Sequence, residues 1–385
     1  MGLTALAAGG CAPGLQPGPT GSGLGAMPGQ AARYRLTRDW GPLPPRVPDL
    51  RPAPPPIVGT AHAEDRRSPD VARLVRDAVE QAGGFSRIVR PGDRVLIKPN
   101  LVTNARSGTG FTTDIRVVEA VARLALDAGA RTIVFAEGSA SATAGGVTTY
   151  RRGATTSAAF AAGGFVALAR RLDAALLDLN EAGREPGGRE LAREVPLAHG
   201  LRRPAYWLSK AFLDADRVIS VPVLKNHEYT GVTLALKNWI GVAPADVYHQ
   251  PGARVAKWGL DHSLHGLARH IVDLVMLRPP DYVVMDALVG IDSGVTVYPY
   301  RPGPRGPMRA VLAGADPVAV DTIGCLTMGY APATIGHLVL AEAVGLGVAD
   351  PGRIQVRGAG IEPFRPEFQI PVNGRYVPGR HGERS

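Results

Sequence analysis

Cysteine is nearly absent from this chain of 385 residues, and the two that occur, Cys11 and Cys325, lie far apart. There is no C-x-x-C pair, so a zinc or iron–sulfur site held by four cysteines of one chain is excluded. Long apolar runs are also missing, and none reaches the roughly 20 residues that a membrane-spanning helix needs. No glycine-rich loop ends in GK[ST], which excludes an ATP-hydrolysing P-loop.

The basic residues are numerous but dispersed. The formal charge of +9 suggests a nucleic-acid partner at first sight. However, the longest basic runs are pairs, and few aromatic residues lie among them. Because nucleic-acid-binding surfaces concentrate their basic residues on one face, we expect no nucleic-acid partner.

The first 57 residues differ in composition from the rest. They include GPLPPRVPDLRPAPPP and other stretches rich in glycine and proline, which cannot build a core. We predict a disordered Gly/Pro-rich tail or linker over residues 1–57, an α/β domain over 58–345 and a C-terminal extension over 346–385.

The opening MGLTALAAGGCAP resembles the end of a bacterial export signal, without its basic start or a full apolar segment. As written, the chain is expected to be cytoplasmic. The alternative is export by a twin-arginine or lipoprotein route, if the true start lies upstream.

From residue 58 onward, amphipathic helical patterns alternate with short apolar strands. Helical periodicity is present over 68–84, 112–130, 157–172, 261–277 and 316–329, the last with Asp316 as its N-cap and Pro317 at its first position. Strands are predicted over 92–98, 132–137, 175–180, 217–224, 282–286 and 309–313. This alternation predicts an α/β fold with a largely parallel sheet and helices on both faces.

Polar residues follow five of these strands. They are Lys98 and Asn100, Glu137, Asp178 and Asn180, Lys225 with Asn226 and His227, and Asp286. In any protein, strands are followed by polar loops, which would explain polar residues at the ends of one or two strands. Because ligands bind beyond the carboxyl ends of parallel strands, we expect Lys98, Asn100, Lys225, Asn226 and Asp286 to line one concave site, with His227 nearby in an irregular segment.

Lysine is as scarce as asparagine, yet the two occur together. Only five of the 43 basic residues are lysines, and three of those precede an asparagine, in Lys98-Pro-Asn100, Lys225-Asn226 and Lys237-Asn238. This favours positions that need a compact, titratable ammonium, holding a carboxylate or phosphate together with the amide. Lys237 alternatively pairs with a buried carboxylate. Lys257 has no such neighbour, so its replacement by arginine is expected to have no effect.

The same segments resemble successive blocks of a known family. VLIKPNLV, VFAEGS, ADRVISVPVLKNHEYTGVTLALKNWIGV, MDALVGIDSG and VLAGADPVAVDTIGCLTMGY are similar, in this order, to the bacterial and archaeal domain-of-unknown-function 362 family over residues 90 to 332. Some relatives append a ferredoxin-like cysteine cluster, which this chain lacks, so no iron–sulfur cluster is expected. The resemblance implies no general activity.

The residues themselves suggest the chemistry. We predict catalytic roles for Lys98, Lys225, His227 and Asp286, and substrate-binding roles for Asn100, Asn226, Lys237 and Asn238. His262 and His265, three apart on a helix, suit a divalent metal with Glu137 or Asp286 as an oxygen ligand; a surface histidine pair is the alternative. Cys325 is expected to pack in the core.

Two functions remain open at this stage. The first is an enzyme of isomerase or lyase type, which moves a proton next to a carboxylate or phosphate, with or without a divalent metal. The second is a non-catalytic accessory protein that binds an anion or a metal, with a place at the cell envelope.

Overall fold

The computed structural model describes residues 42–47, 56–64, 69–140, 150–183, 190–227, 229–250, 256–261, 263–291, 304–361, 370–372 and 375–377. The predicted tail therefore lies mostly outside the described residues. One part of it that is described, 42–47, lies against the domain, because the backbone N–H of Val47 donates to the carbonyl of Val344.

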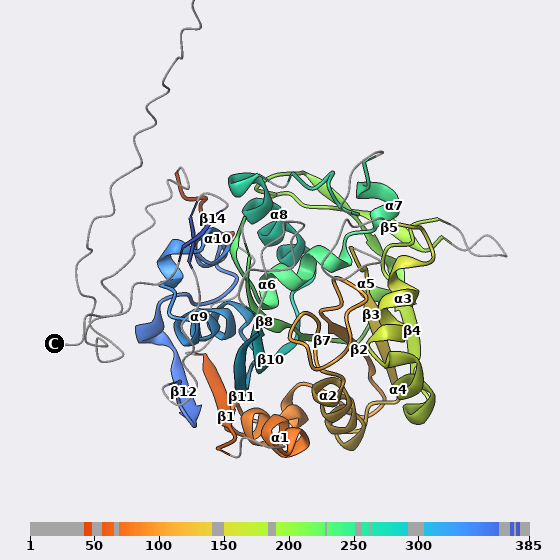
Figure 1. The fold of residues 1–385 in the computed structure, drawn as a ribbon. Coiled ribbons are helices and arrows are strands. Elements are labelled where there is room, and N and C mark those ends of the chain that lie inside the picture. The colour runs from red at the N-terminus through yellow and green to blue at the C-terminus, as the bar shows by residue number, and fades with distance from the viewer. Residues whose placement is uncertain are drawn as a thin grey trace, which may run out of the picture.

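A mixed but mostly parallel sheet forms the centre of the molecule (Figure 1). In spatial order its strands are β12 (Gln355–Gly358), β1 (Ile57–His62), β11 (Pro304–Gly314), β10 (Tyr282–Ile291), β7 (Arg217–Val221), β2 (Arg94–Pro99), β3 (Thr132–Glu137) and β4 (Ala175–Asp178). Along this path β11 runs antiparallel to both of its neighbours, and the other pairs are parallel. The predicted largely parallel α/β sheet is confirmed.

The remaining described strands form short antiparallel pairs. β8 (Val223–His227) pairs with β9 (Gly231–Thr233) and also continues alongside β10. β5 (Ala192–Pro196) pairs with β6 (Ala205–Ser209), and β13 (Ile370–Val372) pairs with β14 (Arg375–Val377). The strand predicted over 217–224 is thus two strands, because Pro222 has no N–H for the ladder.

Helices cover both faces of the sheet, as predicted. The core on one face includes residues of α1 (Val71–Gln81), α2 (Ile115–Asp127), α3 (Thr155–Ala162) and α4 (Phe165–Leu172). The opposite core includes residues of α5 (Lys210–Leu213), α6 (Ala235–Asn238), α7 (Ala245–Tyr248), α8 (Leu264–Leu277), α9 (Pro317–Thr327) and α10 (Gly336–Val344), with Cys325 fully buried there. Four 3-10 turns, η1 (Phe85–Arg87), η2 (Trp239–Val242), η3 (Pro332–Thr334) and η4 (Pro351–Arg353), complete the described elements.

Local chemistry explains several helix boundaries. The Asp114 and Asp316 carboxylates cap α2 and α9 by accepting backbone N–H groups of the first turn, and Pro317 occupies the first position of α9 as predicted. The single helix predicted over 157–172 is wrong. Gly163 and Gly164 divide it into α3 and α4, and Gly164 has a φ of 84°, which a helix interior cannot contain.

Three strand predictions need correction. β10 continues past Asp286 to Ile291, since β11 and β8 pair with its second half. β1 was not predicted, and β12 lies within the predicted C-terminal extension although it pairs with β1 in the main sheet. The predicted boundary at residue 345 therefore separates β12 from the sheet to which it belongs. The other domain boundaries stay predictions. Within the described part of the chain, no helix is long and apolar enough to cross a membrane.

Candidate functional site

Five polar side chains from different elements meet in the interior at the carboxyl ends of the central strands. We call them the Lys–Asn cluster: Lys98 of β2, Asn100 just after it, Glu137 at the end of β3, Lys225 of β8 and Asn238 of α6. Lys98 is 0% exposed, Lys225 1% and Glu137 2%. Of the residues predicted to line one concave site, Lys98, Asn100 and Lys225 meet here, whereas Asn226 and Asp286 make other contacts. The cluster is buried and does not line an open cleft.

Glu137 holds the centre of the cluster. Its Oε1 accepts from the Lys98 Nζ at 2.7 Å and from the backbone N–H of Gly138 at 2.7 Å, and its Oε2 accepts from the N–H of Leu101 at 2.8 Å. The Lys98 ammonium also donates to Asn238 Oδ1 at 3.2 Å and to the Pro99 carbonyl at 3.1 Å. Burial lowers the pKa of Lys98, and the Glu137 carboxylate opposes that shift.

Lys225 has a different environment. Its Nζ donates to Asn100 Oδ1 and to the Phe111 carbonyl, both at 2.8 Å, and no carboxylate is among these partners. Burial, and then repulsion from Lys237 and Lys98, hold the pKa of Lys225 well below its usual value. Asn100 links the two halves of the cluster, because its Nδ2 donates to Asn238 Oδ1 at 3.2 Å.

Lys257 is a third buried lysine, and its surroundings do not support the expectation that arginine can replace it without effect. It is 1% exposed, and its Nζ donates to the carbonyls of Gly138, Ile240 and Gly241 at 2.9, 3.1 and 3.0 Å. Burial is the main cause that lowers the pKa of Lys257, to about 7. Three acceptors around one Nζ suit the ammonium form, and sequence alone gave no signal for it.

Two glycines allow these groups to pack so closely. A Cβ at Gly138 would lie 2.7 Å from the Lys257 Nζ and 2.8 Å from Asn180 Oδ1. A Cβ at Gly241 would lie 2.5 Å from the Lys98 Nζ. Such separations are too short for ordinary van der Waals contact, so both positions require glycine.

Asn226 and Lys237 do not join the described hydrogen bonds of the cluster. Successive side chains of a strand point to opposite faces, so Asn226 turns away from its neighbour Lys225, and its Nδ2 donates to the Tyr330 hydroxyl at 3.4 Å. The prediction that Asn226 acts beside Lys225 therefore overlooked the strand period. Lys237 is half-buried and lies close enough to repel Lys225.

His227 is the last residue of β8 and not part of an irregular segment, which corrects the prediction. Its Nδ1 accepts from the N–H of Tyr229 at 3.2 Å. This contact uses the Nδ1 lone pair, so the neutral ring carries its proton on Nε2.

Asp286 is buried, and its hydrogen-bond partners are not members of the Lys–Asn cluster. It accepts from the backbone N–H of Asp114 at 2.7 Å and from that of Leu288 at 2.9 Å. Burial, together with repulsion from Asp114, raises the pKa of Asp286 to about 7. Asp178 and Asn180, at the end of β4, bond mainly to Thr156 and to neighbouring backbone and hold loops in place.

The predicted metal ligands do not form a site among the described residues. No group of three or more His, Cys, Asp or Glu side chains there is arranged to hold a metal ion. Both oxygens of Glu137 already accept hydrogen bonds. His262 lies outside the described residues, as does the side chain of His265, so their predicted metal role stays untested.

Residues 95–326 match the family model described as "Domain of unknown function (DUF362)". The chain belongs to this family. The match confirms the resemblance in the sequence, and it includes Lys98, Lys225 and Lys257. Among curated proteins, this DUF362 chain is 29% identical over 274 residues to the thylakoid-associated protein sll1697 of Synechocystis, covering 71% of this chain and 74% of that protein.

Two solved structures are similar to this chain at a low level. The lactate racemase apoprotein of Thermoanaerobacterium thermosaccharolyticum is 14% identical, with a TM-score of 0.36, over 75% of this chain and 62% of that one. A structural-genomics protein from Thermotoga maritima is 12% identical, with a TM-score of 0.33, over 66% of this chain and 57% of that one. The DUF362 chain thus spans about three fifths of each.

Proposed function

We propose that this DUF362 chain is an enzyme that acts on a small carboxylate or phosphate at the Lys–Asn cluster, by isomerase- or lyase-type proton transfer. One observation carries the proposal: three lysines are each at most 1% exposed, and among the described residues Glu137 is the one carboxylate hydrogen-bonded to any of their ammonium groups. Buried lysines normally pair with carboxylates, so three of them beside one carboxylate favour a site for an anionic ligand.

The lysines differ in a way that suits a division of roles. Lys98 is paired with Glu137 and stays charged, so it can stabilise negative charge on a substrate. Lys225 has no carboxylate among its described hydrogen-bond partners, and burial and repulsion from Lys237 lower its pKa, which suits Lys225 to accept a proton. In this mechanism Lys225 removes the proton next to the carboxylate and Asn100 donates to the anion. The predicted binding role of Asn238 does not fit, because both of its Nδ2 hydrogens are already donated, to the Lys98 carbonyl and to Ser220 Oγ. His227, with its proton on Nε2, is the proton donor in this proposal.

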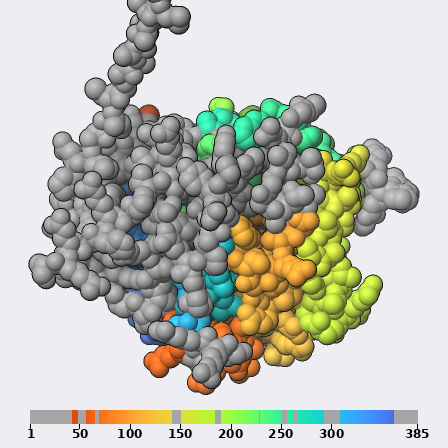
Figure 2. All heavy atoms as spheres, in the orientation of Figure 1, coloured from red at the N-terminus to blue at the C-terminus, as the bar shows by residue number. Residues whose placement is uncertain are grey.

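Access to Lys225 depends on the loop between β2 and α2. The Phe111 carbonyl of this loop accepts from Lys225, and Gly108 and Gly110 of the loop have φ values of 81° and 76°. Figure 2 shows residues that follow β2 at the surface of the molecule, and Arg106 and Gly108 are exposed. A substrate that reaches Lys225 replaces the Phe111 contact, which requires the loop to move.

The second candidate is a non-catalytic anion-binding protein. The full burial of Lys98 and Lys225 favours it, because affinity alone needs no exposed reactive group. The two functions differ in whether a carbon–hydrogen bond of the bound anion is broken.

Hydrogen exchange separates these functions. Small 2-hydroxy, 2-amino and 2-oxo acids and their phosphate esters are incubated with the protein in D2O, and deuterium uptake is followed by mass spectrometry. We expect one class to exchange with the wild type and not with Lys225→Met, while Lys210→Met, at a partly exposed lysine paired with Glu190, behaves as the wild type. Binding without exchange would favour the second candidate. A parallel series with a chelator tests for a divalent metal.

A further inference from the structure

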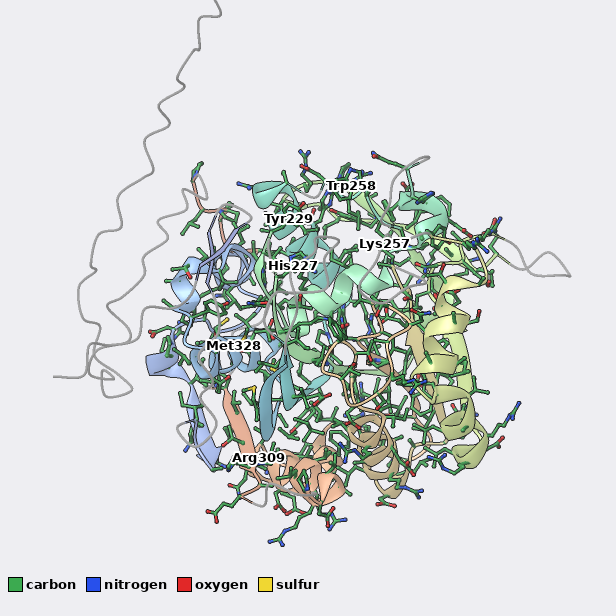
Figure 3. All side chains as sticks on the ribbon, in the orientation of Figure 1. His227, Tyr229, Lys257, Trp258, Arg309 and Met328 are labelled. Atoms are coloured by element: carbon green, nitrogen blue, oxygen red, sulfur yellow. The ribbon has the colours of Figure 1, made fainter. Side chains whose placement is uncertain are left out.

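A cavity of about 670 Å³ lies beside α8, and none of its described lining residues belongs to the Lys–Asn cluster. We call it the α8 pocket. The residues that matter to its chemistry are Arg202, Arg203, Tyr229, Trp258, Asp261 and His270. Its volume suits a ligand of nucleotide or drug size. Figures 1 and 3 show α8, Tyr229 and Trp258 on the same upper side of the molecule.

The two arginines stand on a turn that α8 holds in place. The backbone N–H groups of Leu201, Arg202 and Arg203 all donate to the carboxylate of Asp273, at 2.6, 2.9 and 3.2 Å. Asp273 is fully buried in α8. A carboxylate that accepts three consecutive N–H groups fixes the backbone, so the turn that carries both arginines is set before a ligand arrives.

The same carboxylate orients His270 in the wall of the pocket. Tyr206 donates its hydroxyl proton to Asp273 at 2.7 Å, and the Tyr206 oxygen lies 2.6 Å from His270 Nδ1. Since that hydroxyl has one proton, Nδ1 of His270 is the donor in the second contact. His270 is 1% exposed, so this chain places a fixed polar ring at the pocket.

Aromatic and cationic groups share the pocket. Trp258 is 40% exposed, which is unusual for so large an apolar side chain, and Tyr229 also contributes to the lining. Arg202 pairs with Asp261 at 3.0 Å, and Arg203 donates to the Gly259 carbonyl at 3.0 Å. Two guanidinium groups against one carboxylate leave the lining with a net positive charge.

We propose that the α8 pocket binds a flat aromatic or heteroaromatic molecule that carries a carboxylate or a phosphate. The ring stacks on Trp258, and the anion takes the forked N–H groups of Arg203 and Arg202. This site is separate from the Lys–Asn cluster, and the proposal does not depend on the function proposed there.

Calorimetric titration tests the proposal with AMP and 2-naphthoate as flat anions, and with adenosine and inorganic phosphate as the ring and the anion alone. We expect saturable binding of at least one flat anion and weaker binding of adenosine and phosphate. Trp258→Ala and Arg203→Met should each raise its dissociation constant by about tenfold. Thermal melting checks that both variants fold.

Two variants serve as controls. Arg193→Met removes an exposed arginine of β5 that pairs with Asp214 outside the pocket, and Lys225→Met removes the Lys–Asn cluster's free amine. Arg193→Met should leave the affinity unchanged, and Lys225→Met distinguishes binding in the α8 pocket from binding at the cluster. The proposal is overturned if neither flat anion binds, if Trp258→Ala and Arg203→Met bind as tightly as the wild type, or if binding is lost in Lys225→Met instead.

Discussion

Replacing Glu137 with glutamine is the sharpest test of how the Lys–Asn cluster is held together. The change keeps the shape of the side chain and removes its charge. Both oxygens of Glu137 accept hydrogen bonds, three in all. The NH2 group of glutamine cannot accept, so it would face at least one of these N–H donors without a bond. Lys98 also loses its carboxylate partner 2.7 Å away while it remains buried.

Removal of one partner of a buried ion pair costs about 3–5 kcal/mol of unfolding free energy. At about 2 °C per kcal/mol for a chain of this size, the melting temperature should fall by roughly 6–10 °C. The matched control is Glu119→Gln, which removes a partly exposed carboxylate paired with Arg123 and Arg171 and should cost less than about 1 kcal/mol.

Denaturant unfolding of both variants, followed by circular dichroism, measures the difference. Lys98→Met and the Lys98→Met/Glu137→Gln double variant complete a double-mutant cycle, and the double variant should lose less than the sum of the single losses. If Glu137→Gln is no more destabilising than Glu119→Gln, the buried ion pair does not stabilise the cluster, and our account of it fails.

Three further outcomes are expected. Lys257→Arg should lower the melting temperature by several degrees, because a guanidinium cannot fit among three carbonyls. Lys210→Arg, at a partly exposed lysine, should not lower it. Equal melting temperatures of the two variants would contradict this prediction. Gly241→Ala should destabilise the protein and weaken anion binding, since its Cβ would lie 2.5 Å from the Lys98 Nζ; a wild-type denaturation curve would refute it. The folded-state pKa of Asp286, about 7, exceeds the unfolded value, so the folded state binds more protons between about pH 4 and 7, and the stability from this group falls as pH rises through that window. Asp286→Asn should therefore gain stability relative to the wild type between pH 5 and 7.5, and a pH-independent difference would exclude this role.

The alternation of helices and strands was enough to predict the fold class, because apolar periodicity and capping residues are local signals. Asp316 and Pro317 start α9 as their residue types require. The strand order and the reversed direction of β11 could not be read locally, because they depend on pairing between distant segments. β1 was missed because its short run, IVGTAH, follows directly on the Gly/Pro-rich segment.

The site was predicted in part. The scarcity of lysine pointed to Lys98 and Lys225, and the strand ends pointed to Asn100. Glu137 was expected to bind a metal and instead pairs with Lys98. Lys257 was missed because its partners are backbone carbonyls, which no residue type reveals. Asn226 was misplaced because adjacency in sequence was given more weight than the alternation of side chains along a strand.

The rate of deuterium uptake by Lys225→Arg, with Lys210→Arg as the control, tests the central claim most directly. Arginine keeps a positive charge at position 225 but cannot become a neutral base near neutral pH. If Lys225 removes a proton from a bound anion, exchange should fall by roughly a hundredfold or more in Lys225→Arg and stay at the wild-type rate in Lys210→Arg. Exchange at the wild-type rate in a folded Lys225→Arg protein would contradict the proposed role of Lys225.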